Sequence, residues 1–347
     1  MITGMSPSIG QSEQESLVAL AAARANVDQG MIFPFADYTR FLSELLKLCD
    51  RSLGRLVAVG QVQPEVAIAA DRAETDLVEL LGVSPFSADA SAAVKEFESD
   101  AELVYVSNPN RVTGASLSFS ELRLLANATA DGLLIVDEPY CDSFEISARP
   151  LIDSYANIII LRPLSSVASP GFADAGFAVA DEQLIKRLNA FAPAESISAG
   201  QRQLIVDKVI DRGYAQAQAS ERHREALRLA TSLNRCGVQG RITAGDFLLL
   251  RVADPKCVGN YLARRQVPIE NIDGYPQMKN HMRFRLQQPS VNDRLLEAFQ
   301  RMPSEYFRMR PSRLRKTTLR RGAEETSTTG NRMPAGSVGT GRERKLR

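Results

Sequence analysis

The sequence predicts an α/β fold with a mostly parallel sheet and helices on both faces, followed by a smaller C-terminal α+β domain. Two observations support this prediction. Between residues 103 and 191, short β-branched runs alternate with helical stretches, which is typical of parallel strands joined by crossover helices. After Ile210 the pattern changes to a long polar helix, two apolar runs and a final amphipathic helix, as expected for a separate domain.

Four apolar runs predict the strands of the larger sheet. They are LVYV at 103–106, LLIV at 133–136, IIIL at 158–161 and GFAVA at 176–180. A helix is expected after the first run, because Ser118 and Glu121 have the spacing of a capping box. A second helix is expected from about Asp181 to Phe191.

Three polar loops directly follow these strands. They are Asn108–Gly114, Asp137–Tyr140 and Ser165–Ser166. In parallel sheets, ligands bind in the crevice at the carboxyl ends of the strands. The sequence therefore predicts that the three loops share one pocket.

The C-terminal part predicts a helix from about Tyr214 to Arg235 that ends at Gly237, because glycine is a common helix stop. Two strands and a last helix follow, namely FLLLRV at 247–252, MRFRL at 282–286 and NDRLLEAF at 292–299. The first hundred residues have weaker patterns. There we expect helices near 12–26 and 38–52 and a strand at EVAIAA, 65–70.

These patterns divide the chain into four parts. They are an N-terminal helical segment (1–55), a shortened large α/β domain (56–212), a small α+β domain (213–303) and a basic tail (304–347). Residues 301–347 carry 13 Lys or Arg and 4 Asp or Glu, a net charge of +9, whereas residues 1–300 carry 29 and 37, a net charge of −8. The tail has little to bury, so we expect it to be disordered. It lacks interleaved aromatic residues, so we do not expect a nucleic-acid partner.

The composition argues against several classes of protein. The chain of 347 residues is 44% hydrophobic and 24% charged, as in globular proteins, and no apolar run approaches the ~20 residues of a membrane span. Its start has neither a basic flank nor an apolar block, so we expect no secretory signal. The four cysteines are far apart without a CxxC pair, which favours a reducing, cytoplasmic setting. We also expect no metal site.

Other catalytic chemistry has little support in the sequence. His223 lies in the charged stretch ERHRE and is expected on a solvated helix face. His281 is expected in a surface loop, with a position in the crevice beside Arg283 as the alternative. Cys141 is expected to be a buried, inert thiol. The chain has neither a nucleophile-elbow pattern nor a Walker loop.

Five segments occur in an order and spacing that is informative as a set. They are Asn108–Gly114, Val136–Tyr140, Leu161–Ser166, Gly171–Ala180, and Met282–Arg285 before NDRLLEAF. This arrangement resembles the class I/II pyridoxal-phosphate aminotransferases of fold type I, and most of all their histidinol-phosphate aminotransferase branch. The resemblance runs from about Val66 to Phe299. It implies an aminotransferase-like fold, a homodimer and pyridoxal 5'-phosphate as cofactor.

The resemblance also implies roles for individual residues. Asp137 matches the carboxylate that binds the pyridine nitrogen, and Tyr140 matches the tyrosine that bonds the ring oxygen. Arg283 matches the arginine that grips the α-carboxylate of the substrate. The further cofactor-binding positions are Asn110, Thr113 and Ser165. Without the resemblance, Asp137 is a loop residue after a buried strand and Arg283 is an exposed arginine on an edge strand.

Several family residues are replaced in this chain. Ser166 stands at the position of the Schiff-base lysine, and serine cannot form an aldimine. The nearest lysine along the chain is Lys186. Asp174 stands at the position of the phosphate-binding arginine, where a carboxylate repels phosphate. Pro163 replaces the hydroxyl residue three positions before the lysine.

Further differences concern the cofactor ring and its phosphate. Arg111 replaces the asparagine that contacts the ring, and Val112 replaces the proline beside it. The position of the aromatic residue that stacks on the ring is expected near Ala73. The N-terminal half is shorter than in the family and has no glycine-serine turn entering a helix, the usual phosphate cradle.

The sequence therefore predicts a degenerate site with no catalytic residue. Our leading hypothesis is a catalytically inactive homologue with a binding or regulatory role, paired with itself or with a related aminotransferase and able to bind a small molecule. The alternative is an active pyridoxal-phosphate-dependent enzyme acting on an amino acid or amino-alcohol phosphate. It would use Lys186 or Lys208 as a surrogate base after rearrangement, or would hold the cofactor non-covalently. A third hypothesis is a decayed gene product without function.

Overall fold

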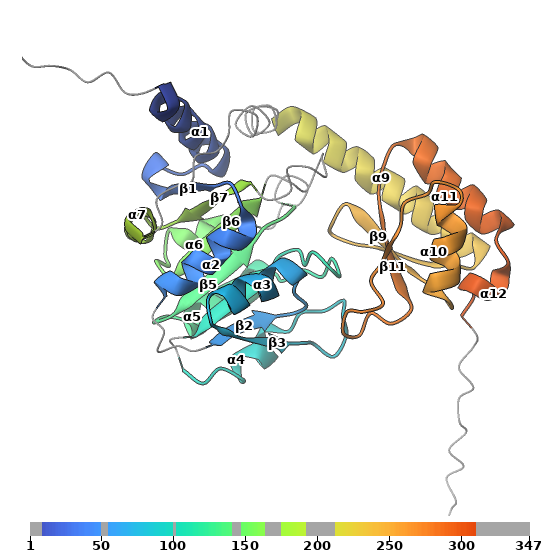
Figure 1. Ribbon diagram of the computed structural model, residues 1–347, viewed down its shortest axis with the longest axis horizontal. Helices are drawn as coiled ribbons and strands as arrows, with labels where there is room; N and C mark the ends of the chain where they lie inside the picture. The colour runs from blue at the N-terminus through green and yellow to red at the C-terminus, as the bar shows by residue number, and fades with distance from the viewer. Residues whose placement is uncertain are drawn as a thin grey trace, which may run out of the picture. The chain divides into compact units, whose positions relative to one another are not determined.

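The computed structural model describes residues 9–49, 55–99, 102–140, 147–163, 175–191 and 212–309, and every structural statement below concerns these residues. They lie in one compact unit, Met1–Met309. The unit contains a seven-stranded sheet and a four-stranded sheet, each covered by helices (Figure 1).

The larger sheet is mostly parallel. Its strands are β1 (Ile32–Phe35), β2 (Arg55–Val59), β3 (Asp76–Leu80), β4 (Leu103–Ser107), β5 (Leu133–Asp137), β6 (Ile158–Pro163) and β7 (Gly176–Ala180). Their order is β1-β7-β6-β5-β4-β2-β3, and β7 is antiparallel to both of its neighbours while the remaining pairs are parallel. This confirms the predicted sheet and all four predicted strands.

Helices cover both faces of this sheet (Figure 1). They are α1 (Ile9–Ala25), η1 (Gln29–Met31), α2 (Tyr38–Leu48), α3 (Pro64–Arg72), α4 (Ala90–Val94), α5 (Phe119–Ala128), α6 (Arg149–Ile152) and α7 (Glu182–Phe191). Successive strand residues point to opposite faces, so Leu133 and Ile135 join the core beneath α2, α3 and α7, whereas Leu134 and Val136 join the core beneath α1, α5 and α6. The predicted capping box of Ser118 and Glu121 starts α5.

The smaller sheet is antiparallel. Its strands are β8 (Gln239–Ile242), β9 (Phe247–Arg251), β10 (Glu270–Asn271) and β11 (His281–Arg285), in the order β10-β11-β9-β8. Its helices are α9 (Arg212–Cys236), α10 (Pro255–Ala263), α11 (Pro289–Arg301) and α12 (Ser304–Phe307). They share one apolar core with the sheet. Gly237 ends α9 in the left-handed region with φ +93°, as the sequence predicts.

Two features of the first hundred residues differ from expectation. EVAIAA at 65–70 is helical, in α3, and not a strand: Val66, Ala69 and Ala70 are buried at helical spacing, and Pro64 starts the helix. The strand β1 between the two expected helices has no counterpart in the prediction. It pairs with β7 and forms one edge of the larger sheet.

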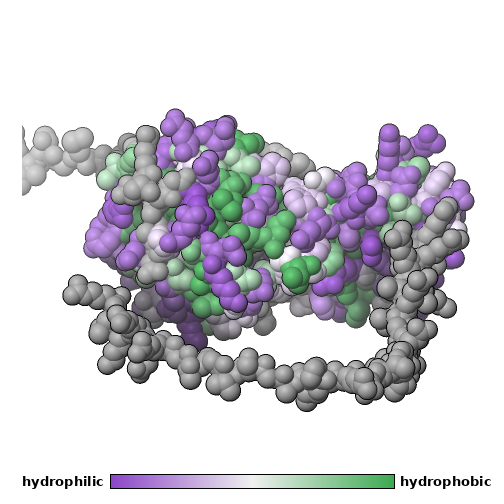
Figure 2. All heavy atoms as spheres, turned by 90° about the horizontal axis from the view of Figure 1, so that it is seen from below, coloured by the Kyte–Doolittle hydropathy of each residue, from purple (hydrophilic) through white to green (hydrophobic). Residues whose placement is uncertain are grey.

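Apolar side chains are also exposed in places on the surface. Figure 2 shows polar side chains over much of one face, with apolar ones between them. The large exposed apolar residues described are Ile68, Val83, Phe119, Phe191 and Leu227. They are spread over α3, the loop after β3, α5, α7 and α9. Among the described residues, no helix has both the length and the apolar character needed to cross a membrane.

Candidate functional site

The loops after β4 and β5 meet at the carboxyl edge of the larger sheet. In the register of these two parallel strands, Ser107 lies beside Asp137, and the Asn108 N–H donates to the Asp137 carbonyl at 2.8 Å. The structure therefore brings together two of the three loops that the sequence predicts to share a pocket. The third, Ser165–Ser166, lies outside the described residues.

The turn after β4 is held by Asn110. Its Oδ1 accepts from the backbone N–H groups of Val112 and Thr113, each at 3.0 Å, and from the Thr113 hydroxyl at 3.2 Å. Its Nδ2 donates to the Gln61 carbonyl at 2.7 Å. Gly114 has φ +66°, a conformation that glycine adopts without strain. Asn110 and Thr113, predicted cofactor-binding residues, therefore stabilise the turn that presents Arg111.

Arg111 forms an ion pair with Asp137. Its Nε donates to Asp137 Oδ2 at 2.8 Å and its Nη2 to Oδ1 at 3.4 Å. The Tyr105 hydroxyl donates to Oδ2 at 3.0 Å. The Asp137 side chain is 0% exposed and that of Arg111 is 21% exposed. Burial lowers the pKa of Arg111, but the charge of Asp137 and the hydrogen bond to it outweigh this effect and raise the pKa.

Two tyrosines complete the surroundings of this ion pair. The hydroxyls of Tyr38 and Tyr105 are 3.1 Å apart, and Arg111 Cζ lies 5.6 Å from the centroid of the Tyr38 ring. Burial, together with the nearby charge of Asp137, raises the pKa of both phenols well above the usual value. They therefore remain protonated and able to donate. Neither tyrosine is singled out by the sequence, because Tyr105 lies within an apolar strand run and Tyr38 lies at the start of an expected helix.

Arg283, on β11 of the smaller sheet, lies beside the same turn. Its Nη1 donates to the Arg111 carbonyl at 2.6 Å. Its Nε donates to Glu270 Oε2 at 2.7 Å, and its Nη2 also contacts Glu270 Oε2. Glu270 is the register partner of Arg283 on β10. The arginine predicted to grip a substrate carboxylate is therefore paired with a carboxylate of its own chain.

Tyr140 follows β5 and packs against the smaller sheet. Its ring centroid is 6.2 Å from that of Phe247, and a Cβ on Gly245 would lie 3.1 Å from Tyr140 Cζ. Burial and the charge of Asp246 raise the pKa of Tyr140. The Asp246 side chain is itself buried, and its Oδ1 has no hydrogen-bond partner within the described part of the chain. Nothing in the sequence distinguishes Asp246 from a turn residue.

Comparisons with known proteins find relatives of this chain. The chain is 30% identical to the histidinol-phosphate aminotransferase of Chlorobium phaeovibrioides over 211 residues, 58% of this chain and 56% of that protein. It is also 30% identical to that of Chlorobium luteolum over 219 residues, 61% of this chain and 60% of that protein. The chain is therefore similar in sequence to histidinol-phosphate aminotransferases. It spans well under two thirds of the length of these two relatives, and no family model matches it.

Solved structures of such enzymes have the same fold. The histidinol-phosphate aminotransferase from Sinorhizobium meliloti, in complex with pyridoxal-5'-phosphate, superposes with a TM-score of 0.73 at 16% identity, covering 83% of this chain and 80% of that one. The enzyme from Clostridium acetobutylicum superposes with a TM-score of 0.73 at 15% identity, covering 86% and 90%. The fold-type-I architecture expected from the sequence is thereby confirmed.

The described residues do not fit the cofactor that these homologues suggest. Asp137, which would have to receive the pyridine nitrogen, already accepts from Arg111 and Tyr105. Helices α2 and α3 both begin at this edge, after β1 and β2. The N-terminus of α2 is capped by the Asp37 carboxylate, which accepts from the Arg40 N–H at 2.8 Å, whereas Gln63 before α3 makes no capping hydrogen bond with its side chain.

Lys186, one of the two candidate surrogate bases of the alternative hypothesis, does not lie at the site in this structure. Because β7 runs against its neighbours, Ala180 at its end lies beside Ile159 near the start of β6. Helix α7 therefore begins at the edge opposite to Asp137. Lys186 is 63% exposed there and pairs with Glu182 at 3.3 Å. The second candidate base, Lys208, lies outside the described residues, as do Ser165, Ser166, Asp174 and Cys141.

The position expected for the ring-stacking aromatic is also wrong. Ala73 caps the end of α3, three residues before β3 starts at Asp76, and so lies at the amino edge of the sheet. The residues that leave β2 at the carboxyl edge are Gln61–Gln63. The error follows from interpreting 65–70 as a strand, since a strand would have placed Ala73 at the other edge.

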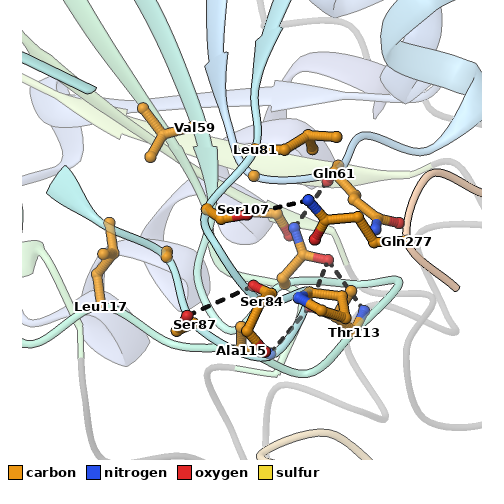
Figure 3. Close-up of a pocket in the computed structure, with 15 residues that line it drawn as sticks. Val59, Gln61, Leu81, Ser84, Ser87, Ser107, Thr113, Ala115, Leu117 and Gln277 are labelled. Carbon is orange, nitrogen blue, oxygen red and sulfur yellow. Dashed lines mark hydrogen bonds between the residues drawn. The ribbon is translucent and has the colours of Figure 1, made fainter. Parts of the chain in front are cut away.

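A small pocket lies beside the turn after β4 (Figure 3). Gln61, Ser107, Thr113 and Gln277 are among the residues around it. It offers about 20 Å³ to a water-sized sphere, room for about one water molecule. Gln61 Nε2 donates to the Pro276 carbonyl, whereas its Oε1 has no partner among the residues described. The pocket is too small for a cofactor ring.

The two histidines do not contribute to the ion-pair cluster. His223 is exposed on α9, as expected. His281, at the start of β11, is buried rather than in a surface loop: its ring lies 5.5 Å from that of Phe86 and its Nδ1 is 3.0 Å from the Lys279 carbonyl. Burial lowers the pKa of His281. Within the described residues, no group of His, Cys, Asp and Glu is arranged to hold a metal ion.

Proposed function

We propose that this chain is an aminotransferase homologue that does not transaminate and that has a binding or regulatory role. One observation carries the proposal. The Asp137 carboxylate is fully buried, and Arg111 and Tyr105 donate to it from within the chain. The ring nitrogen of a cofactor would therefore have to compete with Arg111 for this carboxylate.

Three residues of the sequence support the same proposal from the chemical side. Ser166 replaces the Schiff-base lysine and Asp174 replaces the phosphate-binding arginine of the family pattern. Lys186, the nearest lysine along the chain, lies at the opposite edge of the sheet. At the positions of the family pattern, the sequence therefore carries neither the lysine nor the arginine, and this supports the proposal.

Assembly and location belong to the same proposal. We propose that the chain pairs with itself or with a related active aminotransferase in the cytoplasm, and that a small molecule binds near Tyr140 and Arg283. The division expected from the sequence is revised at two boundaries. Elements of the N-terminal segment (1–55) pack with the large domain (56–212), because β1 pairs with β7 and α2 joins the same core. Phe307 on α12 packs into the core of the small domain (213–303), so the part of the expected tail (304–347) up to Met309 belongs to that domain. Neither a metal nor nucleic acid is part of the proposed role.

The decisive experiment is a titration of the purified full-length chain with pyridoxal 5'-phosphate. Absorbance is followed, then the sample is reduced with borohydride and its intact mass is measured, with an active histidinol-phosphate aminotransferase as positive control. We expect no spectral shift and no added mass. A reducible adduct on one lysine would instead support the alternative, an active enzyme acting on an amino acid or amino-alcohol phosphate.

A further inference from the structure

We infer that the chain occupies its own site, with the Arg111 guanidinium standing where the protonated ring nitrogen of a cofactor would meet Asp137. The inference rests on the proposed function and adds the cause of cofactor exclusion. Both groups are planar cations that present N–H donors to a carboxylate. Arg111 would therefore satisfy the same buried charge with the same chemistry, but from within the polypeptide.

The demand for a cation comes from the burial of Asp137. Its side chain is 0% exposed, so its charge cannot be hydrated. Tyr105 supplies one neutral donor at 3.0 Å, and the charge is balanced by Arg111 at 2.8 Å. Removal of one partner from such a pair leaves an uncompensated buried charge. The pocket around Asp137 therefore needs a resident cation whether or not the protein is an enzyme.

Arg111 is also fixed in position, unlike a surface arginine. Its backbone N–H donates to Ser107 Oγ at 3.2 Å, and its carbonyl accepts from Arg283 at 2.6 Å. Its guanidinium carbon lies 5.6 Å from the Tyr38 ring centroid. Contacts from β4 and β11 therefore hold the backbone of Arg111, while the Tyr38 ring of α2 lies beside its guanidinium.

The substrate side of the site repeats this arrangement. Arg283 would receive a ligand carboxylate, and the Glu270 carboxylate already accepts from it at 2.7 Å. Glu270 occupies the place of a ligand carboxylate as Arg111 occupies that of a ring nitrogen. Its side chain is 47% exposed, so its ion pair with Arg283 is weaker than that of Arg111 with Asp137. Asp137 and Arg283, the two charged residues kept from the family pattern, are both paired with residues of the chain itself.

The test is a chemical rescue: the Arg111 guanidinium is removed by substitution, and methylguanidinium is added to replace it. In full-length Arg111→Ala, we expect a lowered midpoint of thermal unfolding that rises with the logarithm of added methylguanidinium concentration. Methylurea has nearly the same shape without the charge and should have no effect. The native chain and Arg72→Ala, an arginine at the end of α3, should not respond to either compound. Pyridoxine, which presents a pyridine nitrogen, should stabilise Arg111→Ala and not the native chain.

A second variant guards against failure of Arg111→Ala to fold. In Arg111→Ala/Asp137→Asn the carboxylate is gone, so the need for a cation is gone as well. We expect the double variant to be more stable than Arg111→Ala, and the coupling between positions 111 and 137 to amount to roughly 10-fold or more in the unfolding constant. The midpoint of the double variant should not respond to methylguanidinium or pyridoxine. Lack of restoration would overturn the inference, as would equal rescue by methylurea or an Arg111→Ala midpoint equal to the native one.

The two proposals fail in different ways. A reducible pyridoxal-phosphate adduct in the native chain overturns the proposed function and this inference together. Absence of that adduct combined with absence of methylguanidinium rescue leaves the proposed function standing and removes Arg111 as its cause. The loss of the Schiff-base lysine would then be sufficient by itself.

Discussion

The buried carboxylate of Asp137 requires its neighbours to supply a positive charge and hydrogen-bond donors. A buried carboxylate is stable only when it is paired and hydrogen-bonded, and here Arg111 supplies charge while Tyr105 supplies a further donor. Tyr105 in turn contacts the hydroxyl of Tyr38. The effect of a substitution around Asp137 therefore depends on how many donors it leaves to the carboxylate.

Replacement of Tyr105 by phenylalanine tests this dependence. We expect Tyr105→Phe to lower the free energy of unfolding by about 1–3 kcal/mol, because a buried acceptor loses a donor. Urea unfolding measures the change. Tyr155→Phe is the matched control, since that hydroxyl bonds to Asn127 at an exposed position, and its cost should be below about 0.5 kcal/mol. Equal costs for the two variants would contradict the role of Tyr105.

Asp246 gives a prediction for pH. Burial raises its pKa in the folded chain, so the folded state binds a proton more tightly than the unfolded state does. Stability contributed by the protonated form is present below the unfolded pKa and is lost as pH rises through the folded pKa. Asp246→Asn should therefore be more stable than the native chain at pH 7 and equally stable at pH 3. Urea unfolding at both pH values tests this, and a gain that persists at pH 3 would exclude this cause.

The site is only partly predictable from the sequence at this scale. The strand-loop pattern identifies Asp137, Tyr140 and the turn around Asn110, because polar residues after buried strands stand out. The sequence also marks Arg111 as a departure from the family asparagine. It does not predict the partner of Arg111, since residues 26 apart meet only through the register of β4 and β5.

Strands β4 to β7 are predictable because each is a continuous apolar run bounded by polar residues. The run EVAIAA at 65–70 is also mostly apolar but is helical, because short apolar runs do not distinguish a strand from a buried helix. The burial of Val66, Ala69 and Ala70 at helical spacing becomes clear only once the sheet beneath α3 is known. The direction of β7 is likewise a tertiary property, and it places α7 and Lys186 away from the site.

The pairing of β10 with β11 predicts unequal effects for the two members of an ion pair. Arg283→Met loses the bond to the Arg111 carbonyl as well as the Glu270 pair, so we expect it to cost about 1–3 kcal/mol of unfolding free energy. Glu270→Gln removes only a half-exposed charge and should cost less than about 1 kcal/mol. Chemical denaturation of both variants measures the difference. A larger cost for Glu270→Gln would show that the link between Arg283 and the turn contributes little.

At the scale of the whole molecule, the described residues belong to one compact unit that ends at Met309. Two apolar cores lie on the two faces of the larger sheet, and a third lies between the smaller sheet and its helices. The sequence predicts this division into a larger and a smaller α/β part, because the alternation of strands and helices changes after Ile210.

Removal of residues 310–347 tests the independence of this unit. These residues carry 11 Lys or Arg and 3 Asp or Glu, a net charge of +8, so their removal changes the net charge of the chain from +1 to −7. We expect the shortened chain to unfold cooperatively at an unchanged midpoint and to bind an anion-exchange resin at neutral pH. Thermal unfolding and ion-exchange chromatography check the two parts. A lowered midpoint would show that the compact unit depends on residues beyond Met309.

The way in which the turn after β4 is built has an evolutionary consequence. Its shape depends on the Asn110 side chain, on Thr113 and on the conformation of Gly114, and not on the side chain at position 111. That position can therefore accept different residues while the backbone around it stays the same. A substitution there changes what Asp137 binds without changing the backbone of the turn, provided that the new residue or a ligand supplies the charge that Asp137 needs. Position 111 is therefore a site where divergence or protein engineering can change the ligand of Asp137.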